Sequence, residues 1–211
     1  SNSWGYITND LHYGAGENTI DELTVLVWGR TSYSSINLIV DNSGSRINKD
    51  QWSFIDFDRS EVFNFYLEGG GQLAFSGFST NTGGYYLVYD LGAGTDELYN
   101  DGEWHLLGVT FSVSNQEIKF YADGVLKKTH TANGAMTALG SGTKSKRYGF
   151  IAEGSEATSE NGNKGSGGYT GDIAALMFYD SVALTDAEIE TVFRSQADRF
   201  GLIPPPSPPP P

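Results

Sequence analysis

Cysteine is absent from this chain of 211 residues. That absence excludes disulfide scaffolds, thiolate metal sites and cysteine nucleophiles. Long apolar runs are absent too: the longest, Ile173–Tyr179, has the length of a strand and falls short of the roughly 20 residues of a membrane helix. The opening Ser1–Trp4 has neither the basic start nor the apolar stretch of a secretory signal. We therefore expect a chain that does not insert into a membrane and that a packed core stabilises.

Positive charge is scarce. The chain has 13 Lys and Arg residues against 26 Asp and Glu residues, which gives a formal net charge of −13 at pH 7. A field of that sign repels phosphate backbones, so we expect no nucleic-acid partner. Cations, neutral polymers and basic surfaces are the partners that this charge balance favours.

Apolar and aromatic residues, in contrast, are plentiful at 38% and 13% of the chain, which excludes a disordered protein. Roughly 200 residues is an ordinary size for one β-sandwich domain, and we place that domain at residues 1–202. Residues 203–211 are nearly all proline and predict an extended linker; a ligand for a proline-recognition domain is the alternative. Because the chain also lacks an initiator methionine, we expect it to be one module of a larger multidomain protein.

Short segments of alternating polarity recur along the chain, rich in Val, Ile, Phe and Tyr and separated by turn residues. The predicted strands are Leu23–Arg30, Ser35–Asp41, Trp52–Asp58, Val62–Glu68, Leu73–Phe78, Tyr85–Asp90, Trp104–Phe111, Glu117–Ala122, Val125–His130, Tyr148–Ala152 and Ile173–Tyr179. Asp123-Gly124 between two of them is a strong hairpin signal. The pattern predicts an all-β protein.

One helix is predicted near the C-terminus. Thr185 and Glu188 form the sequence signature of a capping box, with the cap residue followed three positions later by an acid. Ile189, Val192 and Phe193 then follow at helical spacing. We expect this helix to cover an open edge or end of the sandwich.

The two-residue period of strands sorts side chains into two faces. The positions that this period places on the outer surface are Trp52, Phe54, Asp56 and Asp58 in one strand, Asn64, Tyr66 and Glu68 in the next, and Lys119 and Tyr121 in a third. Aromatic rings beside carboxylates and amides suit sugars, because the rings stack on pyranose faces while the polar groups bond to hydroxyls. We assign a glycan-binding surface to Trp52, Asp56, Asp58, Asn64, Tyr66 and Tyr121.

Four stretches carry a family resemblance: Asp101–Thr110 (DGEWHLLGVT), Ile118–Gly124 (IKFYADG), Gly171–Tyr179 (GDIAALMFY) and Ala183–Ile189 (ALTDAEI). In order and spacing they resemble laminin G-like domains of the concanavalin A-like lectin/glucanase superfamily. The resemblance implies a concanavalin A-like jelly-roll β-sandwich of two antiparallel sheets with one short C-terminal helix. One departure is Ala174, where the family has an Asp, so no role of that Asp is transferred.

Glycoside hydrolases share this fold. The resemblance implies that a retaining enzyme with this fold would carry a Glu-x-Asp-x-Glu motif on one strand. The best match, Phe54–Asp58, has Phe54 at the nucleophile position and the shorter Asp58 at the acid/base position. We therefore assign no catalytic residues. A glycan-degrading enzyme that uses other acids is kept as an alternative.

Laminin G-like domains often hold a calcium ion at the rim of the sandwich, so the resemblance makes calcium a candidate cofactor. Calcium takes six to eight oxygen ligands, which acidic loops supply. The acids and amide that we assign to such a site are Asp90, Asp96, Glu153, Glu156 and Asn161. A second option pairs Asp172 with Asp10 or Glu17.

These features favour a non-catalytic recognition module that binds glycans on a cell or polymer surface. A structural or adhesive module that contacts protein is the alternative, which the proline-rich tail supports equally. Gln196–Leu202 resembles the ends of such domains in marine microbial and viral surface proteins. We therefore expect an extracellular or virion-surface location.

Overall fold

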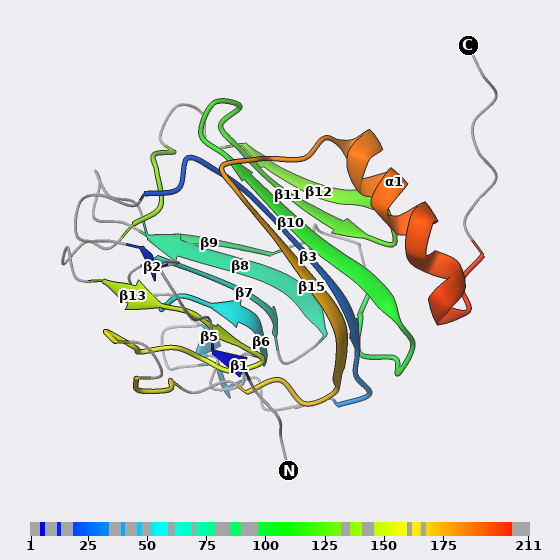
Figure 1. Ribbon diagram of the computed structural model, residues 1–211, viewed down its shortest axis with the longest axis horizontal. Helices are drawn as coiled ribbons and strands as arrows, with labels where there is room; N and C mark the ends of the chain where they lie inside the picture. The colour runs from blue at the N-terminus through cyan, green and yellow to red at the C-terminus, as the bar shows by residue number, and fades with distance from the viewer. Residues whose placement is uncertain are drawn as a thin grey trace.

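A computed structural model gives the fold. It describes residues 5–6, 12–13, 19–33, 39–40, 46–47, 52–58, 62–68, 71–78, 85–89, 97–131, 136–140, 146–159, 162–165 and 168–203. Two antiparallel sheets face each other, and a single helix lies outside them in the described part of the chain (Figure 1). The all-β prediction and the two-sheet sandwich are thereby confirmed. Several predicted segments lie outside the described residues, including most of Ser35–Asp41 and the tail 204–211.

The larger sheet has strand order β1-β14-β6-β7-β8-β9. Its long strands are β6 (Trp52–Asp56), β7 (Phe63–Glu68), β8 (Gln72–Phe78) and β9 (Tyr85–Tyr89), and its short edge strands are β1 (Gly5–Tyr6) and β14 (Phe150–Ile151). Each neighbouring pair is antiparallel.

The smaller sheet has strand order β12-β11-β10-β3-β15. Its strands are β12 (Val125–Thr131), β11 (Glu117–Ala122), β10 (His105–Ser112), β3 (Glu22–Arg30) and β15 (Asp172–Asp180). Two short pairs lie apart from both sheets: β2 (His12–Tyr13) with β13 (Arg147–Tyr148), and β4 (Ile39–Val40) with β5 (Arg46–Ile47).

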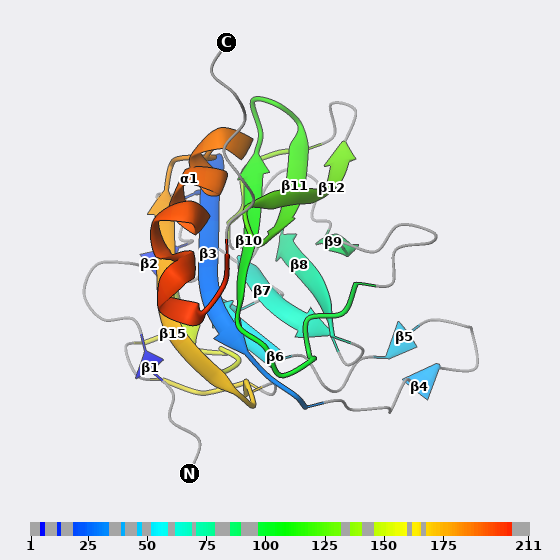
Figure 2. The ribbon, with the colours of Figure 1, turned by 90° about the vertical axis from the view of Figure 1, so that its right-hand side faces the viewer.

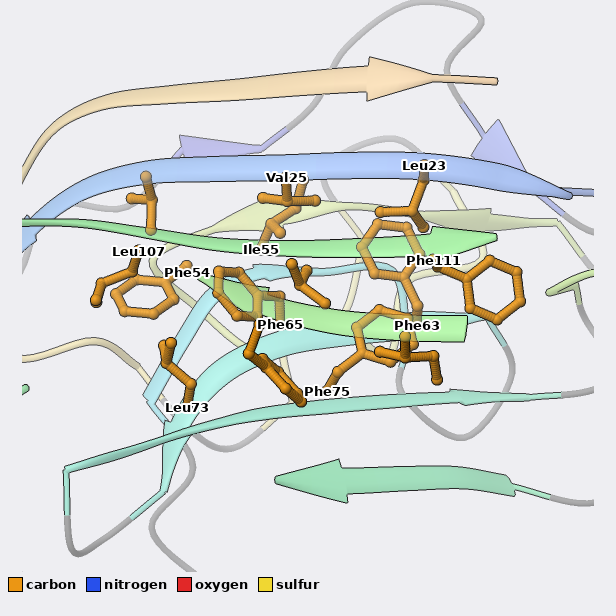
Figure 3. Close-up of a cluster of buried hydrophobic side chains, with 14 of the residues drawn as sticks. Leu23, Val25, Phe54, Ile55, Phe63, Phe65, Leu73, Phe75, Leu107 and Phe111 are labelled. Atoms are coloured by element: carbon orange, nitrogen blue, oxygen red, sulfur yellow. The ribbon is translucent and has the colours of Figure 1, made fainter. Parts of the chain in front are cut away.

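The core fills the space between the sheets (Figure 3). The smaller sheet contributes Leu23, Val25, Val27, Leu107, Val109 and Phe111, and the larger sheet contributes Phe54, Ile55, Phe63, Phe65, Leu73 and Phe75. All of them are almost fully buried. Burying one such side chain contributes about 1.5–3 kcal/mol, so the packing of the two inner faces is the main source of stability.

The outer face of the smaller sheet is apolar as well. Leu26 and Trp28 of β3 alternate with the inward-facing valines and pack under helix α1 (Asp186–Gln196) and the short 3-10 turn η1 (Ala197–Phe200). Trp28 stacks on Phe200 with ring centroids 4.0 Å apart, and its indole N–H donates to Gln196 Oε1 at 2.8 Å. Figure 2 shows α1 in front of β3 and β15. The helix therefore covers a sheet face, and the expectation that it covers an edge or end is wrong.

The start of α1 is the predicted capping box. Thr185 Oγ1 accepts the Glu188 amide, and Glu188 Oε2 accepts the Thr185 amide at 2.8 Å. Ile189 and Phe193 form its buried stripe. No helix in the described part of the chain is long and apolar enough to cross a membrane.

His105, at the start of β10, connects three segments of the chain. Its Nδ1 lies 2.8 Å from Asp123 Oδ2 in the β11–β12 turn, and its Nε2 lies 3.2 Å from Asp101 Oδ1 in the preceding loop. Burial lowers the pKa of His105, but the hydrogen bonds and negative charges of Asp123 and Asp101 outweigh it, so the pKa is raised above its ordinary value. The imidazolium is thus the form that the fold prefers.

Truncating Trp28 should be among the most damaging single changes in the sheet. Trp28→Ala removes the stack on Phe200 and opens a cavity under α1, which should lower the free energy of unfolding by about 3–5 kcal/mol in urea titration. Trp104→Ala is the matched control, because this half-buried tryptophan also packs on Phe200 but lies outside both core clusters. Equal losses in the two variants would contradict the helix-anchoring role of Trp28.

His105 should make stability depend on pH above neutrality. Because its pKa is higher in the folded state than its unfolded value near 6.5, its contribution is fully present below that value. The contribution is lost as pH rises through the folded-state pKa. We expect the urea midpoint to fall from pH 6 toward pH 9, and to fall less in His105→Gln. Parallel pH profiles in the two proteins would show that His105 has no such effect.

Candidate functional site

The outward side of the larger sheet carries a row of polar groups rather than a second apolar layer. Across β14, β6, β7 and β8 the register aligns Phe150, Asp56, Asn64 and Ser76, and the next row on the same side aligns Ser53 with Tyr66. These rows alternate with core rows such as Ile55–Phe65–Phe75. We define the polar face as Ser53, Asp56, Asn64, Tyr66, Glu68, Ser76 and Phe150.

A bulge in β6 decides which residues reach this face. The register shifts between Ser53 and Ile55, so both Phe54 and Ile55 enter the core. The strict two-residue period assigned Phe54 to the outer surface and Ser53 to the core, and the bulge reverses both assignments. Asp56, one step beyond, still lies beside Asn64 as expected.

The predicted exposure of this face is wrong. The exposed fractions are 0% for Tyr66, 1% for Asn64, 3% for Asp56 and 2% for Asp58. The sequence correctly predicts that Asn64, Tyr66 and Asp56 share one side of the sheet, away from the core. It does not predict that these side chains are buried. The alternation of a strand tells which side of the sheet a side chain points to, but not whether that side is exposed to solvent.

Two other predicted residues lie elsewhere or outside the description. Tyr121 is on the smaller sheet, 1% exposed beneath α1, and its hydroxyl donates to Asp186 Oδ1 at 2.8 Å. Burial and this hydrogen bond raise its pKa well above the usual value. Tyr121 therefore does not share a surface with Asp56, Asn64 and Tyr66, because it lies on the other sheet and the helix occupies the outer side of its strand. The backbone of Trp52 pairs with Leu67, while its side chain lies outside the described residues.

Several polar atoms of the polar face have no hydrogen-bond partner among the described residues. They are both amide atoms of Asn64 and the hydroxyls of Ser53 and Ser76. A buried polar group without a partner costs about 1–3 kcal/mol, so such groups are normally paired or satisfied by water or a ligand. Sequence alternation in β8 could have identified Ser76, whereas only knowledge of the bulge identifies Ser53.

The segment after β13 is fastened to β6 at the edge of the polar face. Ser155 donates its amide to Asp56 Oδ2 at 3.1 Å, and Ala152 donates its amide to Phe54 O at 3.1 Å. Arg147 Nε donates to Asp58 Oδ2 at 2.6 Å, in an ion pair that is almost fully buried. These contacts hold one side of the face closed and fix the Asp56 carboxylate in place.

The predicted calcium ligands are only partly described. Asp90, Asp96 and Asn161 lie outside the described residues. Glu153 lies beside Gly168, and Glu156 is exposed. Among the described residues no three His, Asp or Glu side chains gather as a metal site, so these do not form a calcium site on their own.

The second predicted calcium site, Asp172 with Asp10 or Glu17, is also only partly described. Asp172 accepts two hydrogen bonds from the Arg30 guanidinium, at 2.7 and 3.1 Å. Its proposed partners Asp10 and Glu17 lie outside the described residues. Calcium stays a prediction of the family resemblance.

The residues at the two catalytic positions of the best glycosidase match make structural contacts. Phe54, at the position of the nucleophile, is buried in the core, and Asp58 at the acid/base position is ion-paired with Arg147. Asp58 also lies past the end of β6 with φ of 64°, outside strand geometry. The arrangement does not supply the pair of carboxyl groups about 5–5.5 Å apart that retention requires on one strand.

Two open clefts lie away from the polar face. One, of about 500 Å³, lies where β3 ends and β15 begins, and contains the Arg30–Asp172 pair beside exposed Tyr33. The other, of about 390 Å³, lies beside the start of α1, where Lys119 pairs with Glu117 and Asp186. In both clefts the charged side chains already pair with one another. The clefts therefore offer a ligand fewer buried hydrogen-bonding groups without a partner than the polar face does.

Two facing antiparallel sheets with a helix on the outer face of the smaller one define a concanavalin A-like sandwich. Residues 18–190 match the family model described as the concanavalin A-like lectin/glucanases superfamily, so the chain belongs to this family. No curated protein matches the chain.

Solved structures support the same fold at low sequence identity. The heptameric SAP-like pentraxin from Limulus polyphemus has a TM-score of 0.52 at 15% identity, covering 90% of this chain and 80% of that one. The CBM40 of the Ruminococcus gnavus IT-sialidase, bound to α2,6-sialyllactose, gives 0.53 at 13% identity, covering 90% and 98%. The botulinum neurotoxin serotype G binding domain gives 0.54 at 11%, covering 92% and 40%. At such identities the likeness shows the fold.

Breaking the Arg147–Asp58 pair should destabilise the protein strongly. Arg147→Met leaves the Asp58 carboxylate buried beside an apolar side chain and should cost about 3–5 kcal/mol of unfolding free energy. Adding Asp58→Asn should recover most of that loss, because the carboxylate charge that paired with Arg147 disappears as well. Urea titration of both single variants and the double variant measures the coupling, and strictly additive losses would refute it.

Proposed function

We propose that this protein is a non-catalytic glycan-binding module and that its polar face contacts the sugar. The observation that carries the proposal is the buried Asn64 amide, which has no hydrogen-bond partner among the described residues. In the strand register Asn64 lies between Asp56 and Ser76. A buried polar group without a hydrogen-bond partner lowers the stability of the fold. A ligand that hydrogen-bonds to the Asn64 amide would explain why such a group is present.

The chemistry of the face suits a sugar. Tyr66 and Phe150 supply aromatic surface, on which the C–H face of a pyranose packs. Asn64 supplies both a donor and an acceptor, and Ser53 and Ser76 supply hydroxyls that serve as either. Sugar hydroxyls likewise donate and accept, so they can satisfy these groups in several orientations.

Access to the face requires part of the chain to move, because the polar-face side chains are at most 6% exposed. The ordering and displacement of protein segments reduces affinity, so a single site should bind weakly. We propose that the module works outside the cell or on a virion surface, where several copies along a polymer compensate through avidity. The comparison with a CBM40 bound to a sialyllactose supports a glycan as the ligand class.

Asn64→Leu tests the proposal. Leucine has nearly the same volume but no polar atoms, so we expect the free energy of unfolding to rise by about 1–2 kcal/mol as the unmet groups vanish. Glycan binding on an array, followed by calorimetry on the best ligand, should fall by about tenfold or more because the sugar hydroxyls lose their partners. The matched control is Asn115→Leu, in the exposed turn after β10, which should leave binding unchanged.

The outcomes separate the alternatives. Failure of the wild-type protein to bind any glycan, with calcium or with a chelator, would refute glycan recognition. Loss of stability in Asn64→Leu would mean that Asn64 is structural. Capture of cell-surface material that survives periodate oxidation of sugars would favour the adhesive, protein-binding alternative, and release of reducing sugar would favour an enzyme.

A further inference from the structure

The open cleft where β3 ends and β15 begins is accessible without any movement of the chain. It has a volume of about 500 Å³ and is lined by residues 30–33, 102 and 170–172. Sites for small ligands have volumes of roughly 300–1,000 Å³ and combine aromatic or apolar surface with a few placed polar groups. We call it the Arg30 cleft, after the only Lys or Arg among its described lining residues.

The guanidinium of Arg30 is held in a fixed orientation. Its Cζ lies 4.8 Å from the centroid of the Trp104 ring, which is a cation–π contact. Its Nε and Nη2 donate to Asp172 Oδ2 at 3.1 and 2.7 Å. A guanidinium has five N–H donors in one plane, and Asp172 accepts two of them. The other three, on Nη1 and Nη2, have no partner among the described residues, and 44% of the side chain is exposed. Arg30 therefore presents an oriented pair of nitrogen donors at the free end of its guanidinium.

An acceptor and an aromatic ring line the same cleft. Asp172 accepts from Arg30 through Oδ2 alone, so its Oδ1 keeps its capacity to accept, and 61% of the side chain is exposed. Tyr33 is 47% exposed. A sugar hydroxyl both donates and accepts, so it can accept from Arg30 while it donates to Asp172. The C–H face of a pyranose packs on an exposed aromatic ring such as that of Tyr33.

Hydrogen bonds tie together the three chain segments that form the Arg30 cleft. Thr31 Oγ1 donates to Thr170 O at 2.6 Å, and the Gly102 amide donates to Thr31 O at 2.9 Å. Asn100 Nδ2 donates to Tyr33 O at 3.3 Å. Because these contacts hold the walls of the cleft in place, a ligand pays less for ordering the protein here than at the polar face.

We propose that the Arg30 cleft is a second sugar site, which binds one uncharged hexopyranose unit through two adjacent hydroxyl groups. Asp172 already balances the charge of Arg30, and an uncharged ligand leaves that pair intact. A carboxylate ligand would compete with Asp172 for the guanidinium. The inference goes beyond the proposed function, because it depends neither on Asn64 nor on access to the polar face.

The test titrates the intact, isotope-labelled protein with methyl α-D-mannopyranoside, methyl α-D-glucopyranoside and methyl β-D-galactopyranoside, followed by NMR. We expect at least one glycoside to shift the amide signals of Thr31, Tyr33 and Gly102 at millimolar concentration. Its permethylated form accepts hydrogen bonds but cannot donate to Asp172, so it should bind at least about tenfold more weakly. Equal binding of the permethylated form would contradict the proposal.

Two variants remove the two hydrogen-bonding partners. Arg30→Met removes the donors and keeps an apolar chain against Trp104, and Asp172→Ala removes the acceptor. An exposed ion pair adds little stability, so both variants should stay folded, and each should weaken binding by about tenfold or more. Arg199→Met is the matched control, because Arg199 also lies over an aromatic ring, that of Phe200 at 5.6 Å, but does not line the cleft.

The outcomes separate this site from the polar face. Shifts at the cleft that Arg30→Met abolishes and Asn64→Leu leaves unchanged would support the second site. Shifts confined to Asn64, Tyr66 and Ser76 that persist in Arg30→Met would overturn it and leave the proposed function intact. No shift with any of the three glycosides would also overturn it, while the array test of Asn64→Leu would still decide the proposed function. Equal weakening by Arg30→Met and Arg199→Met would mean that net charge, and not the cleft, sets the affinity.

Discussion

The packing of phenylalanine and aliphatic side chains between the two sheets is the interaction on which the rest of the structure depends. Each sheet has two faces, and one face of each sheet packs into this shared core. The smaller sheet is apolar on its second face too, because Leu26 and Trp28 alternate with Val25 and Val27. Helix α1 covers that second face. Among the described residues the outward side of the larger sheet is mixed, with Asp56, Asn64 and Ser76 beside Tyr66, Ala74 and Phe150.

The polar face carries a cost that the fold does not require. Replacing Asn64, Ser53 or Ser76 by apolar residues would remove buried polar atoms that have no hydrogen-bond partner among the described residues. Proteins retain buried groups of this kind where they meet water or a ligand, and binding sites commonly reduce stability for that reason. The Arg147–Asp58 pair and the Ser155–Asp56 hydrogen bond hold the rim of the face in register, which limits how far it rearranges.

The alternation of side chains was sufficient to predict most strands and the inward set of β7. The two-sheet sandwich was predicted from the family resemblance, and the capping box of α1 from Thr185 and Glu188. Alternation failed where a local or tertiary event intervenes. A bulge in β6 exchanged Ser53 and Phe54 between the faces, and nothing in the composition of that strand marks it. Tyr121 points outward as predicted, yet a helix that joins the sheet from 65 residues further along the chain buries it. Asn64 and Tyr66 are likewise buried, and the pattern of a single strand does not encode burial of its outward side.

The low identities to structures of the same fold bear on what may be transferred between them. At 11–15% identity, what two such chains share is the periodic placement of apolar side chains that closes the core. The groups on the outward face of the larger sheet take no part in that core, so they can diverge without loss of the fold. A ligand seen on one member is therefore weak evidence for the ligand of another. The buried Asn64 amide, which has no hydrogen-bond partner among the described residues, belongs to this chain, so the ligand of the polar face has to be established on this protein itself.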